Sequence, residues 1–368
     1  MKKVLILAVA LSSLLLAKSE NETCKKCHPI IVEEFEASLH KNSTYYDDAI
    51  HKAVWDKHPN KAEGKYICAE CHAPNAKNED ELKNGITCTS CHTIKDIEEH
   101  AIINKNVYNK EAKTFYSAEA GREKEKVVYK QESSFFGMNK KTVGSPYHDI
   151  DYTNEKYYTG EVCMGCHSHR QNSHQLDLCK TDKEGAGDKK QNCITCHMPK
   201  VEGSATTIRE SKEHAYHGFA GSKNKPEMLA QYVDIDFQKT QNGFELIVNN
   251  KSPHNLLTHP LRVVELRVNI TRGGKATPLK TTAFARIIGA EGKPAMPWLA
   301  KEVISDTMIK ANEKRVIDYT DTLADGDKVE VLLGYYLVNP KAVENLGLKG
   351  NKEAEKFTVL KQKYFTVK

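Results

Sequence analysis

The pattern of apolar and polar positions divides the chain into three parts. The first is an apolar run from Val4 to Ala17, which follows two lysines and gives way to polar residues. This run is shorter than the roughly 18 to 20 apolar residues that span a bilayer. It predicts a signal peptide over residues 1–17, with export to the periplasm and no membrane span after cleavage. A retained N-terminal anchor is the alternative.

The second part, residues 18–222, has few long apolar periodic runs. One exception is the stretch from Ile30 to Leu39, where Ile31, Phe35 and Leu39 recur near one face of a predicted helix. A region with so little periodic apolar sequence needs another source of core, and a large cofactor is the obvious one.

The third part, from about residue 228, changes to a period of two with Asn-Gly, Gly-Gly and Asp-Gly turns. The expected strands are Tyr232–Phe237, Phe244–Val248, Leu261–Ile270, Thr282–Ile288, Val316–Tyr319, Val329–Val338 and Phe357–Val367. Such a series predicts an immunoglobulin-like β-sandwich over residues 228–368.

Composition narrows the class of protein. The chain has 368 residues, of which 28% are charged and 39% hydrophobic, so it is a soluble globular protein with room for two domains. These values exclude intrinsic disorder and a multi-span membrane protein. The formal net charge of +5 is small and no nucleic-acid motif is present, so we expect no nucleic-acid partner.

The cysteines carry the strongest chemical signal, because ten of the eleven fall in five copies of the motif Cys-x-x-Cys-His. The copies contain Cys24, Cys27 and His28; Cys68, Cys71 and His72; Cys88, Cys91 and His92; Cys163, Cys166 and His167; and Cys193, Cys196 and His197. This spacing is typical of covalent haem c attachment. Two thiols three positions apart meet the two porphyrin vinyl groups, and the next residue places an imidazole under the iron. The motifs therefore predict five haem c groups.

Zinc sites and disulfides are the competing interpretations of a Cys-x-x-Cys pair. Neither requires a histidine directly after the second cysteine, and five pairs do not divide into four-cysteine zinc sites. Cys179 remains outside the motifs and is predicted to be a free thiol.

Each iron needs a sixth ligand or an open position, and the sixteen histidines less the five of the motifs leave eleven candidates. His40 lies at the end of the predicted helix, which carries it away from the first haem toward a different one. His214 and His217 are three positions apart, so one of them could bind iron while the other bonds a propionate. Histidine at both axial positions is the expectation for most sites.

Several segments resemble the multihaem cytochrome c family related to cytochrome c554. They are Cys68–Pro74, Gly85–Ile94, Ser145–His148, Asn192–Pro199, His217–Gly221 and Asn249–Thr258. The resemblance spans roughly residues 22 to 340. It implies His40, His100, His148, His217 and His254 as the distal haem ligands, and a β-sandwich after the haem region.

Three other histidines keep the ligand assignment open. Thr258-His259-Pro260 stands where the family tends to have Pro-Thr-Gly, so His259 competes with His254. His51 and His58 precede the second motif and could displace one of the five. The second motif has the least clearly matched distal ligand.

These observations predict an α + β protein. A haem-packed, mainly helical and loop multihaem cytochrome c domain over residues 18–222 is followed by the sandwich. The expected function is a periplasmic electron carrier between a membrane-bound quinol dehydrogenase and a periplasmic terminal reductase. The alternative is an oxidoreductase with one open haem site, acting on a small nitrogen or sulfur compound. Fold alone does not decide between a carrier and an enzyme.

Overall fold

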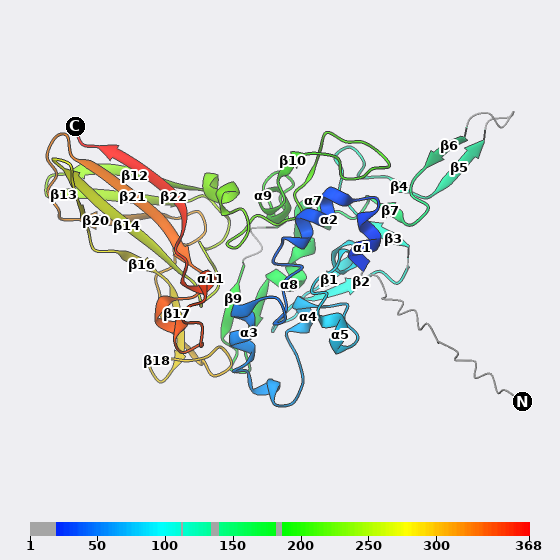
Figure 1. Ribbon diagram of the computed structural model, residues 1–368, viewed down its shortest axis with the longest axis horizontal. Helices are drawn as coiled ribbons and strands as arrows, with labels where there is room; N and C mark the ends of the chain where they lie inside the picture. The colour runs from blue at the N-terminus through cyan, green and yellow to red at the C-terminus, as the bar shows by residue number, and fades with distance from the viewer. Residues whose placement is uncertain (1–19, 112, 134–139, 182–185) are drawn as a thin grey trace, which may run out of the picture.

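The computed structural model describes residues 20–111, 113–133, 140–181 and 186–368, so the predicted signal peptide lies outside the described residues. Figure 1 shows two parts side by side, one of short helices and loops and one of long strands. Within the described ranges, no helix has both the length and the apolar character needed to cross a membrane.

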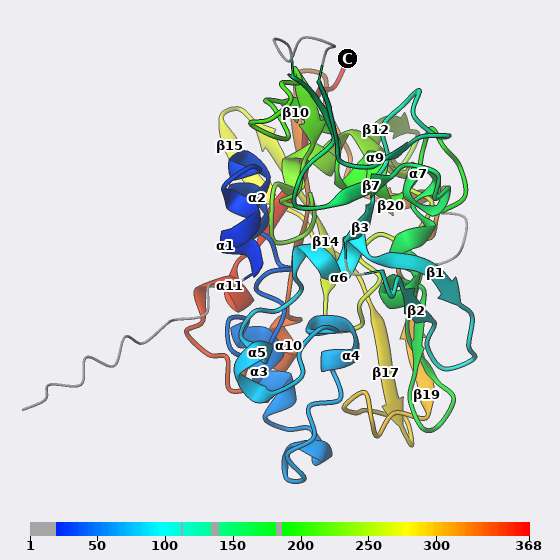
Figure 2. The ribbon, with the colours of Figure 1, turned by 90° about the vertical axis from the view of Figure 1, so that its right-hand side faces the viewer.

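The first part consists of short elements joined by loops (Figure 2). Its helices are α1 (Glu20–Lys25), α2 (Pro29–Glu36), α3 (Ala49–Trp55), η1 (Pro59–Lys61), α4 (Ala69–His72), α5 (Glu79–Leu82), α6 (Cys88–His92), α7 (Lys156–Thr159), η2 (Glu161–Cys163), α8 (Met164–His167) and α9 (Cys193–His197). Its strands are β1 (Ile94–Glu98), β2 (Lys105–Tyr108), β3 (Thr114–Tyr116), β4 (Lys126–Val127), β5 (Lys130–Ser133), β6 (Lys140–Val143), β7 (Asp149–Asp151), β8 (His169–Gln171), β9 (Asp177–Lys180), β10 (Lys200–Glu202) and β11 (Glu213–Ala215). These strands pair only in twos and threes.

Helix α2 is shorter than the predicted helix. It ends at Glu36, and its buried residues are Val32 and Phe35. The backbone N–H of Ser38 donates to the carbonyl of Phe35, which closes the chain into a turn before Leu39. His40 therefore lies beyond the helix, on a turn that leads away from the first motif.

The second part contains two main sheets after the short helix η4 (Pro226–Tyr232). One sheet has the order β12 (Val233–Thr240), β13 (Gly243–Asn250), β20 (Lys314–Tyr319). The other has the order β15 (Lys275–Pro278), β14 (Val263–Arg272), β21 (Lys328–Tyr336), β22 (Thr358–Thr366), with β16 (Thr282–Phe284) also paired to β14. The remaining elements are β17 (Arg286–Ala290), β18 (Lys293–Pro294), β19 (Glu302–Asp306), α10 (Pro340–Val343) and α11 (Lys352–Glu355).

A continuous hydrophobic core joins the two main sheets. Strands β14 and β21 are antiparallel, and Leu266 pairs with Leu333 and Val268 with Val331. These side chains belong to one buried cluster with Leu246 of β13. The alternation along each strand places every second side chain in the core, where burial of one such residue contributes about 1.5–3 kcal/mol.

The observed strands differ from the predicted ones where buried and exposed residues do not alternate along the chain. The expected strand Thr282–Ile288 is broken into β16 and β17, which pair in different sheets. Strands β15, β18 and β19 carry mostly exposed residues, so no apolar period marks them in the sequence. The immunoglobulin-like class stays a prediction.

Hydrogen bonds connect the part with short helices to the part with long strands. Asn172 donates its side-chain amide to the carbonyls of Pro297 and Ala300, at 2.8 and 2.7 Å. Arg286 donates to the carbonyl of Leu178 at 3.1 Å. The region of β17 and the segment before β19 is thereby held against the loops around β8 and β9.

We expect the ion pair between Asp327 and Arg272 to make stability depend on pH. Their side chains are 2.6 Å apart, and Arg272 lowers the pKa of Asp327 to about 2. A carboxyl with a lowered pKa stabilises the fold above its unfolded value of about 3.9 and loses that contribution as pH falls toward the folded value. Thermal melting between pH 5 and pH 2 should therefore show a steeper loss for the native protein than for Asp327→Asn. Parallel curves would contradict this assignment.

Candidate functional site

Local helical geometry brings the two thiols and the imidazole of each motif together. In four motifs a short helix, α4, α6, α8 or α9, ends at the motif histidine. In the first motif the backbone N–H of His28 donates to the carbonyl of Cys24 at 2.9 Å, which makes a similar turn. Residues three apart lie on one side of such a turn. All eleven cysteines are described, and none forms a disulfide.

Side-chain caps fix the start of the helix in the fifth motif. The Asn192 side chain accepts hydrogen bonds from the backbone N–H groups of Ile194 and Thr195. The Thr195 hydroxyl accepts in return from the N–H of Asn192 at 2.8 Å. This reciprocal pair is a capping box, which sets the orientation of Cys193–His197 from local sequence alone.

Four of the five motif histidines face a second imidazole from a distant part of the chain. The ring-centroid distances are 6.2 Å for His28 and His148, 6.3 Å for His92 and His217, 5.9 Å for His40 and His167, and 6.1 Å for His197 and His254. Two metal–nitrogen bonds of about 2.0 Å, with each ring centre about 1.1 Å behind its nitrogen, give about 6 Å. Each pair therefore has the spacing of two imidazoles that bind one metal ion from opposite sides.

Hydrogen bonds at Nδ1 orient six of the predicted ligand histidines. In each case Nδ1 lies 2.6–2.9 Å from a backbone carbonyl oxygen. They are His28, His72, His92, His197, His217 and His254. A carbonyl only accepts, so Nδ1 carries the proton and Nε2 presents its lone pair, as iron ligation requires.

Burial favours the neutral form of these imidazoles. It lowers the pKa of His40 and of His217 to about 3, and that of His72 and of His167 to about 4. Neutral imidazole is the form that binds a metal ion. With two thiols beside each motif histidine, the donor set fits covalently attached haem c.

The structure places the side chain of His100 at the surface. Strand β1 carries the chain away from His92, and the side chain of His100 lies 3.5 Å from Glu98 and is 44% exposed. His100 also lines a surface pocket with His169 and Met164. This exposed position beside a carboxylate gives no support to the distal role of His100, which stays a prediction.

His214 supports its neighbour His217. Its Nδ1 lies 2.9 Å from the carbonyl of Gly203 and its Nε2 lies 3.0 Å from the carboxylate of Glu34. The same carboxylate accepts a hydrogen bond from the backbone N–H of His217 at 2.8 Å. Both ring nitrogens of His214 are therefore engaged, and Glu34 holds the segment that carries His217.

The second motif differs from the other four. Nδ1 of His72 and Nδ1 of His51 lie 2.7 and 2.9 Å from the same oxygen, the carbonyl of Ser43. The ring of His51 lies 4.4 Å from that of His72, closer than the spacing of about 6 Å in the other pairs, and its Nε2 is bonded to the hydroxyl of Tyr66 at 3.1 Å. Among the described residues, no imidazole faces His72 in the way that the other four pairs face one another.

Each of the five motifs lies close to at least one other motif. The thiols of Cys71 and Cys166 contact each other, and so do those of Cys163 and Cys193. His40, opposite His167, interacts electrostatically with His72 and His197. The fourth motif is therefore the link between the second and the fifth. The first and third motifs are linked through His148, which lies near both His28 and His92.

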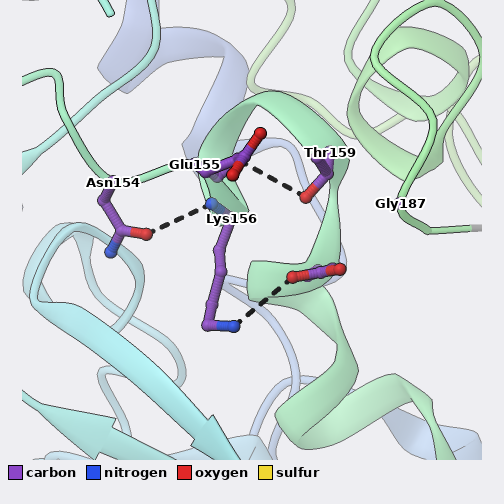
Figure 3. A pocket seen from close by; sticks show the side chains of 6 residues that line it. Asn154, Glu155, Lys156, Thr159 and Gly187 are labelled. Atoms are coloured by element: carbon purple, nitrogen blue, oxygen red, sulfur yellow. Dashed lines mark hydrogen bonds and ion pairs between the residues drawn. The ribbon is translucent and has the colours of Figure 1, made fainter. Parts of the chain in front are cut away.

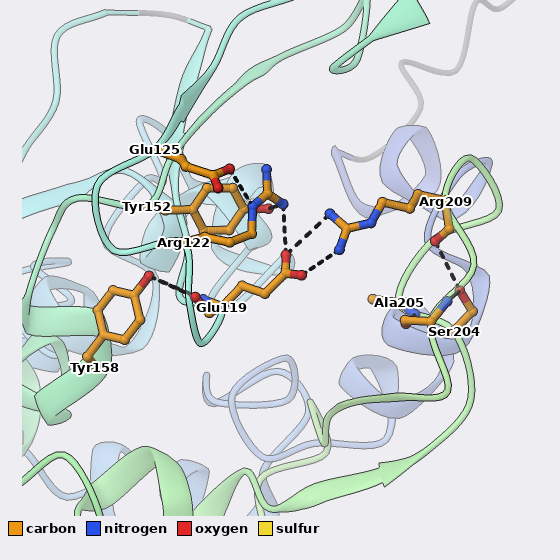
Figure 4. A network of polar contacts seen from close by, with 9 residues as sticks. Glu119, Arg122, Glu125, Tyr152, Tyr158, Ser204, Ala205 and Arg209 are labelled. Carbon is orange, nitrogen blue, oxygen red and sulfur yellow. Dashed lines mark hydrogen bonds and ion pairs between the residues drawn. The ribbon is translucent and has the colours of Figure 1, made fainter.

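A polar network holds the loop that orients His28 (Figure 4). Glu119 pairs with both Arg122 and Arg209. Arg209 belongs to the loop whose Ala205 carbonyl lies 2.7 Å from Nδ1 of His28. These charges are partly exposed, so each pair contributes at most about 1 kcal/mol.

A second polar cluster surrounds α7 (Figure 3). The Asn154 side chain accepts from the N–H of Lys156 at 3.2 Å, and Lys156 pairs with Glu161 at 3.4 Å. These contacts pair Lys156, one of the charged residues that line a surface pocket.

Cys179 lies on β9, which pairs with β8. Burial raises the pKa of its thiol, which disfavours the reactive thiolate. Cys179 is half-buried, and its role as a free thiol in the haem-loaded protein stays a prediction.

The chain is similar to known proteins in two comparisons. Residues 23–93, which contain the first three motifs, match the family described as cytochrome c554 and c-prime. No curated protein matches the chain significantly. Among solved structures, the chain is similar to a penta-haem cytochrome c552 from Thermochromatium tepidum, with a TM-score of 0.68 and 22% identity. The match covers 94% of this chain and 98% of that chain, so the two share a fold.

Proposed function

We propose that this chain, a multihaem cytochrome c related to the cytochrome c554 family, carries electrons between a membrane-bound quinol-linked donor and a terminal reductase. Haem c is covalently attached at its Cys-x-x-Cys-His motifs. The observation that carries the proposal is the set of four imidazole pairs about 6 Å apart. An iron with two strong protein ligands exchanges electrons without binding a substrate.

The placement of the motifs supports electron transfer through the molecule. The first and third motifs form one group through His148, and the second, fourth and fifth form another around His40. The third and fourth motifs connect the two groups through an interaction between Cys91 and Cys163. This proximity of the motifs supports the passage of electrons between the haems of one chain.

The location and the partners are part of the proposal. The predicted signal peptide of residues 1–17 supports export to the periplasm. There a carrier meets a membrane-bound quinol dehydrogenase on one side and a periplasmic reductase on the other.

Stopped-flow mixing with quinol-loaded membrane vesicles tests this function. We expect the vesicles to reduce all five haems of the oxidised holoprotein, and the terminal reductase with its acceptor to reoxidise them. Vesicles treated with a quinol-site inhibitor are the control. A holoprotein that stays oxidised in contact with active, uninhibited vesicles would contradict the proposal.

One observation favours a second function, catalysis at the haem of the second motif. Among the described residues, no imidazole lies about 6 Å from His72 as in the four pairs, whereas its Nδ1 is oriented like that of His28, His92 and His197. An iron with one protein ligand has a position for a small molecule. This candidate function is an oxidoreductase for a small nitrogen or sulfur compound, supplied with electrons by the other four haems.

A further inference from the structure

The imidazole pair at the fourth motif has a different orientation from the other three pairs. The ring planes of His40 and His167 are 76° apart, so the two rings are nearly perpendicular. The corresponding angles are 30° at the first motif, 17° at the third and 21° at the fifth. The fourth motif therefore offers its iron crossed imidazoles, whereas the other three motifs offer nearly parallel ones.

The fourth pair also lacks the hydrogen bonds that orient the other ligands. Nδ1 of His40 is buried and has no hydrogen-bond partner among the described residues, and its ring packs against Phe219 with 4.0 Å between the centroids. No hydrogen bond within the described part of the chain reaches Nδ1 of His167 either. In each of the other three pairs, at least one Nδ1 lies 2.6–2.9 Å from a backbone carbonyl oxygen.

These hydrogen bonds rank the four closed haems by potential. A hydrogen bond at Nδ1 makes an imidazole a stronger donor to iron, and a stronger donor favours ferric over ferrous iron. The potential should therefore be lowest at the third and fifth motifs, where both imidazoles bond a carbonyl. The first motif is intermediate, because His28 is bonded while Nδ1 of His148 is buried without a partner among the described residues. The fourth motif should have the highest potential.

The angle between the ring planes acts in the same direction. Parallel imidazoles donate π electron density to the same iron d orbital, which separates its energy from that of its neighbour and stabilises ferric iron. Crossed imidazoles donate to both orbitals equally, so the two orbitals stay close in energy and this stabilisation is lost. Such an iron gives a strongly anisotropic low-spin signal in electron paramagnetic resonance, with a higher largest g value than an iron between parallel rings. The fourth haem is therefore distinguishable by spectroscopy.

The fourth motif also lies beside three other motifs. Phe219 packs against the ring of His40 and, at 6.4 Å between centroids, against the ring of His217, which faces the third motif. The thiol of Cys166 contacts the second motif, and that of Cys163 contacts the fifth. An electron on the fourth haem is thus close to three of the other four haems.

We propose that the haem attached to Cys163 and Cys166 has the highest potential of the four haems with paired imidazoles, and that it holds the first electron these four take up. The crossed rings and the missing Nδ1 hydrogen bonds both favour its ferrous state. This inference rests on the proposed electron-carrier function and adds the position at which electrons collect within the chain.

A redox titration of the native holoprotein, followed by low-temperature electron paramagnetic resonance, tests the proposal. We expect one strongly anisotropic low-spin signal and three rhombic ones. During stepwise reduction the anisotropic signal should disappear before the other low-spin signals. At the potential where half of it is lost, two of the rhombic signals should still be about tenfold more oxidised than reduced, which corresponds to a separation of about 59 mV.

Two matched substitutions assign the anisotropic signal to its haem. Methionine has no planar ring, so His40→Met should remove the anisotropic signal and leave the three rhombic signals in place. His254→Met is the control, because His254 faces His197 at only 21°. It should remove one rhombic signal and leave the anisotropic one, including its midpoint potential. Each variant must keep five haems in a pyridine haemochrome assay.

Three results would overturn the inference. Four rhombic signals without an anisotropic one would mean that His40 and His167 are not crossed on the iron. An anisotropic signal that survives in His40→Met would belong to another haem. An anisotropic signal that disappears together with the rhombic signals, or after them, would place the first electron elsewhere. None of these results removes the electron-carrier function, which the vesicle experiment tests separately.

Discussion

His40→Met is expected to raise the potential of one haem and to slow electron passage through the molecule. His40 faces His167, and methionine in place of an axial histidine raises a haem potential. Axial ligands tune haem potentials over about 0.8 V, so we expect a rise on the order of 100 mV. Transfer of an electron away from that haem should then be about 50-fold slower, because 59 mV corresponds to a tenfold change for one electron. Spectroelectrochemistry and flash-induced electron transfer measure the two effects.

His100→Met is the matched control for this substitution. The sequence resemblance gives both histidines the same role, whereas only His40 faces a motif imidazole. We expect no change in any haem potential when His100 is replaced. A shift in His100→Met together with unchanged potentials in His40→Met would reverse the assignment.

Blocking haem attachment is expected to unfold residues 20–222 while the two main sheets stay folded. Apart from Ile50, every buried residue of the main hydrophobic cluster lies between Val233 and Val367. The motif part has only short elements and depends on its cofactors for a core, as metal domains do. With serine at all ten motif cysteines, hydrogen exchange should show little protection before residue 222 and native protection in β14 and β21.

Cys179→Ser is the control for replacing a cysteine by serine without removing a haem. Cys179 belongs to no motif, so this variant should keep its haem groups and native protection in both parts. Persistent protection of α2 and α9 in the haem-free chain would show that the polypeptide supplies its own core there, contrary to this account.

Features that depend only on residues close together in the chain could be predicted from the sequence. The motif cysteines and histidines are fixed by a single helical turn, and a period of two marks β14 and β21 because one face of each strand is buried. The exposed strands β15 and β19 have no such period and were not predictable.

Which histidine faces which motif histidine depends on the tertiary structure. The spacing of histidines along the sequence therefore could not assign the pairs. His148 belongs to the first motif although the third lies nearer in the chain. The resemblance gives His100 a distal role, but β1 leads it to the surface.

The central claim is that four of the haem irons are closed by paired imidazoles. Low-temperature electron paramagnetic resonance of the oxidised protein, with a pyridine haemochrome count on the same sample, tests it most directly. The account predicts five haems per chain, four of them low-spin and the fifth high-spin at the second motif. Fewer than four low-spin haems would contradict the imidazole pairs and, with them, the proposed route for electrons.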